Sequence, residues 1–108
     1  MIGRRLSSAA KKLDVVVVAA RYAPDGNLAL AQVYERRGQV WTDLVLFDRE
    51  DLVQRLRAGK RVAAGVPAQV PGDFEVRESV RLSGVNGRAV VRAEGATSTT
   101  DDLRVPAF

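Results

Sequence analysis

Short apolar segments separated by glycine-containing turns fill most of this chain. Segments this short with turns this frequent restrict the chain to a sheet-rich fold. The segments alternate apolar and polar residues or are rich in β-branched residues, as strands are. The turns carry Asp25-Gly26, Arg37-Gly38 and Asn86-Gly87, in which glycine accepts the positive φ of a tight hairpin. The sequence therefore predicts strands over residues 13–22, 28–36, 40–47, 61–66, 74–82 and 88–93.

One segment follows a helical period instead. Asp48 is suited to accept the free amides of a helix start, and Gly59 is suited to end the helix. The apolar stripe between them consists of Leu52, Val53 and Leu56. We therefore expect one short helix between the third and fourth strands. This element order is that of an all-β, OB-like Greek-key barrel, and other small barrels and α+β sheets permit a similar order.

Charge is distributed unevenly along the 108 residues, whose formal net charge is +4. Residues 1–12 hold four bases and no acid, whereas the remaining residues hold 13 bases and 13 acids. On a helical wheel the bases of residues 1–12 lie opposite the apolar side chains, which predicts a basic amphipathic arm. A neutral body does not bind nucleic acid through its net charge alone. We divide the chain into this arm (1–12), a barrel (13–94) and a polar linker with an acidic C-terminal tip (95–108).

The chain has no Cys and no His. Disulfides, thiolate or imidazole zinc sites, Cys nucleophiles and His-dependent triads are therefore excluded. No spacing forces two carboxylates together, and Glu78 is expected to pair with an arginine. We predict a protein that is not an enzyme and that has no metal or cofactor. The apolar run at 15–20 is too short for a signal peptide or a membrane span, so we expect a cytoplasmic protein without membrane contact.

Two motifs lie around the helix and the first turn. A strand from Trp41 to Phe47 leads into the helix, which is followed by a Leu-x-x-Gly-x-x-Val pattern over residues 56–62 and by Gly65. Residues 21–26 read Arg-Tyr-Ala-Pro-Asp-Gly. Together these motifs resemble the central strand, the helix and the Arg-Tyr-x-Pro-x-Gly turn of bacterial single-stranded DNA-binding proteins. The resemblance implies an OB barrel that forms a homo-oligomer and stacks unpaired bases on Trp41 and Phe47.

The last residues add a third likeness to that family. Asp101 and Asp102 precede Pro106 and Phe108, and acidic tips ending in Pro-Phe recruit DNA-maintenance proteins in the family. The resemblance implies that these four residues bind a protein partner. In the alternative interpretation, the two aspartates cap a terminal helical turn.

The candidate binding face lies on the third predicted strand. Trp41 and Phe47 share one face because side chains alternate along a strand, and a two-residue loop places Tyr34 opposite Trp41. Leu44 and Leu46 are then expected to point into the core. Exposed aromatic rings stack unpaired bases at roughly 1 to 3 kcal/mol per base. The candidate nucleic-acid-binding residues are Tyr22, Tyr34, Trp41, Phe47, Arg36, Arg37, Arg77, Arg81 and Arg92.

Two functions stay open for this face. In the first, it binds single-stranded nucleic acid, DNA in the first place and RNA as the alternative, with the arginines on phosphates. In the second, the aromatic rings are core or interface, the arginines are a solvated surface, and the chain is an assembly module. Its apolar outer face would then include Leu28, Leu30 and Val45. A two-residue loop in the last hairpin also predicts that Arg92 lies directly opposite Arg81.

Overall fold

The computed structural model describes residues 13–69, 73–85 and 87–108, so the predicted basic arm at 1–12 lies outside the described residues. Strands predominate in these residues, as predicted, and one short helix accompanies them. The elements are, in chain order, β1 (Val15–Tyr22), β2 (Leu28–Arg37), β3 (Val40–Trp41), β4 (Val45–Asp48), α2 (Arg49–Arg57), β5 (Val62–Pro67), β6 (Phe74–Val85) and β7 (Arg88–Ala93).

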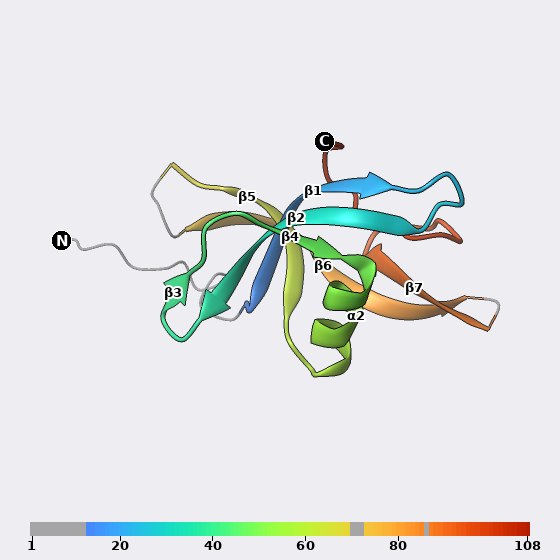
Figure 1. Cartoon of the computed structure of the whole chain (residues 1–108), viewed down its shortest axis with the longest axis horizontal. Helices are drawn as coiled ribbons and strands as arrows, with labels where there is room; N and C mark the ends of the chain where they lie inside the picture. Colours follow the sequence, from blue (N-terminus) through green and yellow to red (C-terminus); the bar gives the residue numbers. More distant parts are fainter. Residues whose placement is uncertain (1–12, 70–72, 86) are drawn as a thin grey trace.

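The strands form one strongly curled sheet with the shape of a half-barrel (Figure 1). Its order is β3-β2-β1-β5-β6-β7, and β4 pairs with β2 beside this path. Neighbouring strands are antiparallel except for β1 and β5, which are parallel. A Greek key is built from antiparallel strands, so the parallel pair departs from the expected arrangement. The architecture is a mostly β, curled sheet consistent with a small barrel.

The predicted third strand is split into β3 and β4, and this break reverses the expected faces. The β2–β3 turn places Trp41 opposite Arg36 instead of Tyr34. Phe47 lies opposite Ala31 and is 5% exposed, whereas Leu46 is 57% exposed. Residues 42–44 leave the strand conformation, and side-chain alternation is not carried across them. The prediction that Phe47 faces outward and Leu46 inward is therefore wrong.

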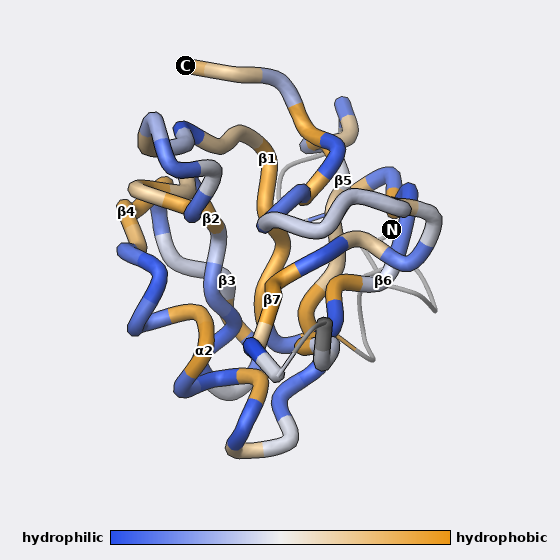
Figure 2. Tube along the Cα trace, turned by 90° about the vertical axis from the view of Figure 1, so that its right-hand side faces the viewer, coloured by the Kyte–Doolittle hydropathy of each residue, from blue (hydrophilic) through white to orange (hydrophobic). Residues whose placement is uncertain are grey.

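The core lies inside the curl, where apolar segments of β1 and β7 appear in Figure 2. Val15 and Val17 of β1 are fully buried in it together with Leu52 of α2. The alternate residue Val16 is also fully buried, on the other face of β1, in a smaller cluster with Phe74. Both faces of β1 are therefore covered, since its apolar residues belong to a different cluster on each side.

The helix begins and ends where the sequence predicts. The Asp51 N–H donates to Asp48 Oδ1 at 2.8 Å, and the Asp48 N–H donates to Asp51 Oδ2 at 3.1 Å, which together form a capping box. Gly59 follows the helix with a φ of 82°. Among the described residues no helix is long and apolar enough to cross a membrane.

The C-terminal segment packs on the strands. Asp102 forms a parallel bridge with Arg92 of β7, and Ala107 forms one with Ala20 of β1. Leu103, between them, is fully buried. The segment predicted as a linker and acidic tip therefore connects β7 with β1.

Candidate functional site

The predicted aromatic row does not form an open face. Tyr34 and Trp41 come together through Phe74, with ring centroids 5.3 and 4.7 Å from the Phe74 centroid. The Trp41 indole N–H is buried, and none of the residues that the structure describes accepts a hydrogen bond from it. Phe47 lies in the core, and the Arg55 guanidinium carbon stands 4.5 Å from its ring centroid. These rings pack against other side chains of the protein, so Trp41 and Phe47 do not share an exposed face of the sheet.

Tyr22, the remaining aromatic candidate, holds the C-terminal segment. Its hydroxyl oxygen accepts the Leu103 N–H at 2.8 Å. Burial raises the pKa of the Tyr22 phenol, and this hydrogen bond opposes the rise only in part. The side chain is thus a structural contact between β1 and the chain end.

Asp101, expected to bind a protein partner, is instead the centre of a buried network. Its Oδ2 accepts the Leu28 N–H and the Arg49 Nε–H, both at 2.7 Å, and its Oδ1 accepts the Val91 N–H at 2.9 Å. Burial raises the pKa of the Asp101 carboxyl, but the hydrogen bonds from Arg49, Leu28 and Val91 outweigh burial and leave that pKa below its ordinary value. One carboxylate thereby joins β2, β7, α2 and the C-terminal segment. Leu28, a candidate for the outer apolar face, is also buried.

The other predicted tip residues also contact the sheet. The Pro106 carbonyl accepts the Ala20 N–H at 2.9 Å. Arg21 donates from Nε to the Phe108 backbone oxygen at 3.0 Å, and its guanidinium carbon lies 4.7 Å from the Phe108 ring centroid. Together with the backbone bridge of Asp102 to β7, these contacts hold the residues predicted to recruit a partner.

Three of the five candidate arginines are paired with carboxylates. Each pair is partly exposed, and surface pairs of this kind stabilise little, but they leave the guanidinium neutralised. The N–O distances are 3.4 Å for Arg36–Asp14, 3.6 Å for Arg37–Glu35 and 3.4 Å for Arg77–Glu75.

The other two candidates belong to an unneutralised row. Arg81 lies directly opposite Arg92, as predicted from the hairpin loop. Arg61 directly precedes Val62, which pairs with Val80, and Arg61 and Arg81 both line one groove beside the end of this ladder. Within the described ranges none of these three guanidinium groups has a carboxylate at ion-pair distance. We call Arg61, Arg81 and Arg92 the arginine row.

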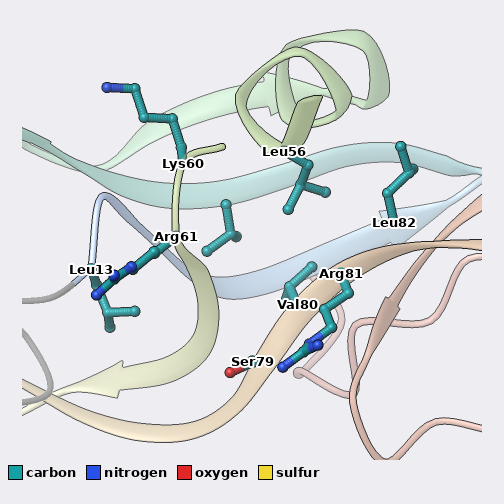
Figure 3. Close-up of a pocket in the computed structure, with 9 residues that line it drawn as sticks. Leu13, Leu56, Lys60, Arg61, Ser79, Val80, Arg81 and Leu82 are labelled. Atoms are coloured by element: carbon teal, nitrogen blue, oxygen red, sulfur yellow. The ribbon is translucent and has the colours of Figure 1, made fainter. Parts of the chain in front are cut away.

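Two members of the arginine row line a groove with a cavity volume of about 470 Å³. In Figure 3, Arg61, Ser79 and Arg81 lie along its lower side, and Leu56 lies along its upper side. Lys60 stands at one end, also without a carboxylate partner in the described part of the chain. The apolar lining consists of Leu13, Leu56, Val62, Val80 and Leu82. We call this hollow the basic groove.

Sequence reasoning found Arg81 and Arg92 but missed Lys60 and Arg61. The Asn86-Gly87 pair in the sequence predicts the first register locally, whereas the register between β5 and β6 depends on the longer connection at residues 68–73. The signal that was available is the pair of bases that directly follows Gly59.

Among the described residues no cluster of three or more His, Cys, Asp or Glu side chains could hold a metal ion. Comparison with known protein families, characterised proteins and solved structures finds no match to this chain.

Proposed function

We propose that this protein binds single-stranded nucleic acid without catalysis, and that the basic groove and the arginine row are its contact surface. The observation that supports this is the presence of Arg61, Arg81 and Lys60 around an apolar floor, with no carboxylate of the described residues at ion-pair distance. A guanidinium matches two phosphate oxygens at once, and it also stacks on planar groups such as bases. The apolar floor suits the faces of bases or sugars.

The arrangement of the row favours an anionic polymer over a single anion. Arg81 and Arg92 occupy the neighbouring strands β6 and β7, Arg61 directly precedes β5, and strands in a sheet are spaced about 4.8 Å apart. Like charges directly opposite each other destabilise a sheet, so a chain of phosphates laid across the strands would relieve the repulsion at several positions.

This proposal places binding away from the aromatic rings. Tyr34, Trp41 and Phe47 pack within the protein, and the groove offers no aromatic side chain. The proposal needs only a curled sheet that carries the arginine row; the Greek-key order of an OB barrel is not part of it, because β1 and β5 are parallel. A cytoplasmic location stays part of the same proposal.

Fluorescence anisotropy with a labelled oligothymidine, measured over a range of salt concentrations, tests the proposal. Four cations, namely Lys60 and the arginine row, predict a slope of log K against log salt of about −3, at roughly −0.7 per phosphate on a single strand. Arg81→Gln is expected to weaken binding about tenfold and to reduce the slope by about 0.7.

Arg77→Gln is the matched control, because Arg77 lies on the same strand but is paired with Glu75. It is expected to leave the slope unchanged. Absence of binding by the wild-type protein at low salt, or equal losses in the two variants, would refute the groove as the contact surface. Strong quenching of Trp41, the sole tryptophan, would instead assign binding to the aromatic rings.

A further inference from the structure

A strip of exposed side chains runs along β4 and into the first turn of α2. Leu44 and Leu46 are 44% and 57% exposed, which is high for large apolar residues. Asp43 and Glu50 have no hydrogen-bond or ion-pair partner within the residues that the structure describes. We call Asp43, Leu44, Leu46, Asp48 and Glu50 the acidic strip.

The acidic strip lies on an open strand edge. In the described part of the sheet β4 pairs only with β2, so the N–H and C=O groups on its other edge have no strand partner. An exposed edge that carries apolar side chains is a template for pairing with another chain.

The basic groove lies beside a second open edge. β5 pairs with β6 only as far as Val80, and from Arg81 onward β6 pairs with β7 alone among the described strands. A second hollow adjoins the groove at Leu82 and extends along β6 to Gly84. This edge therefore borders two hollows that meet at Leu82, and the basic groove supplies the apolar lining and the cations.

We infer that this protein associates with itself head to tail, with β4 of one copy adding to the open β6 edge in the basic groove of the next. Leu44 and Leu46 would enter the apolar floor. Asp43 and Glu50 would face the cations of the rim, which include Lys60, Arg61 and Arg81. The two surfaces are complementary in charge and share apolar centres and unpaired backbone edges.

A symmetric contact between two β4 edges is disfavoured, because it sets one acidic strip against another. The head-to-tail contact joins different surfaces, so each copy keeps one free strip and one free groove. Association is therefore expected to be open-ended, with a mean mass that rises with concentration. It is also expected to weaken with salt, since the charges are exposed. Because the oligonucleotide of the proposed function would occupy the same groove, it is expected to dissociate the assemblies.

Sedimentation velocity over a hundredfold concentration range tests the inference. The wild-type protein is expected to show a mean mass that rises steadily with concentration. Leu46→Lys is expected to weaken association at least tenfold by placing an extra cation against the basic rim. Val40→Lys is the matched control, since Val40 is 68% exposed on the neighbouring β3 and outside the strip. A monomer at every concentration, or a mass that stops at the dimer, would overturn the inference.

Charge reversal then identifies the two surfaces. A strip variant (Asp43→Lys with Glu50→Lys) and a groove variant (Arg61→Glu with Arg81→Glu) are each expected to be monomeric. Mixed together they are expected to associate, because the reversed strip again matches the reversed groove. Circular dichroism confirms that both variants fold, and a folded pair that fails to associate would contradict the inference.

The inference does not rest on the proposed function, and the two fail separately. Leu46→Lys keeps the basic groove intact, so it is expected to bind the labelled oligothymidine as the wild-type protein does while losing self-association. If the wild-type protein assembles but does not bind the oligonucleotide, the proposed function is refuted and the inference of self-association is not.

Discussion

Two arginine environments in this molecule differ in what faces the guanidinium group. Arg49 donates to Asp101 at 2.7 Å, and the Asp101 side chain is 1% exposed. Arg81 lies between Arg61 and Arg92, with no carboxylate near it in the described residues. The effect of each arginine on the stability of the fold depends on the group that faces it and on how buried that group is. We expect Arg49, which faces a buried carboxylate, to stabilise the fold, and Arg81, which faces another arginine, to destabilise it. A surface that keeps cations side by side is suited to an anion from outside.

The largest expected effect on the free energy of unfolding comes from removing the Arg49–Asp101 ion pair. Asp101→Asn removes the charge and turns an amide donor toward the N–H groups of Leu28 and Val91 or toward Arg49. Loss of one partner of a buried ion pair costs about 3 to 5 kcal/mol, so the free energy of unfolding in urea is expected to fall by about 3 kcal/mol. Asp102→Asn, a half-buried neighbour, is expected to change it by less than about 1 kcal/mol. Equal effects in both variants would contradict the role of Asp101.

Acid titration tests the same network in the wild-type protein, because lowering the pH protonates the Asp101 carboxylate. Because the pKa of the folded Asp101 carboxyl lies below the ordinary 3.8, its contribution to stability is complete above that value. The contribution is lost as the pH falls from 3.8 through the folded pKa. The midpoint of thermal unfolding is expected to fall over this range in the wild-type protein and to fall less in Asp101→Asn. Parallel curves would show that other carboxylates dominate acid unfolding.

A smaller effect is expected at the contact between β1 and the C-terminal segment. Tyr22→Phe leaves the Leu103 N–H without its acceptor, which costs about 1 to 2 kcal/mol for a partly buried donor. Tyr34→Phe is the control, because no described residue forms a hydrogen bond with the Tyr34 hydroxyl. Hydrogen exchange at Leu103 is expected to accelerate in Tyr22→Phe alone. An unchanged exchange rate at Leu103 would show that the Tyr22 hydroxyl does not hold this N–H.

The smallest effect, and the one of opposite sign, is expected on the Arg81 side. Arg81→Gln relieves repulsion from Arg61 and Arg92, so the free energy of unfolding is expected to rise by about 0.3 kcal/mol at low salt. The gain is expected to vanish at high salt, where screening removes the repulsion in the wild-type protein. A loss of stability in urea unfolding would show that Arg81 has a stabilising partner.

Local signals in the sequence were sufficient for the helix and for the last hairpin. Asp48 and Asp51 form a capping box within four residues, and the Asn86-Gly87 turn places Arg81 opposite Arg92. Each of these features depends on residues close together in the chain. The mostly β architecture follows from the same kind of short-range pattern.

The features that the sequence did not predict depend on distant parts of the chain. Phe47 was placed on the wrong face because residues 42–44 interrupt the strand, and periodicity cannot show an interruption of this kind. Asp101 was assigned to a partner-binding tip because the last residues resemble the acidic tip of single-stranded DNA-binding proteins. Its burial requires Arg49 and two backbone amides on other strands, which only the folded chain brings together.

The position of Asp101 along the chain has a consequence for how the protein folds. The residue that accepts the Leu28 N–H is 73 positions away, so this contact closes a long loop and forms late. On a ribosome, where synthesis proceeds from the N-terminus, every described strand is synthesised before Asp101 is added. Until then the Arg49 guanidinium and the N–H groups of Leu28 and Val91 lack this acceptor, so the sheet cannot reach its final stability before the end of the chain has joined it.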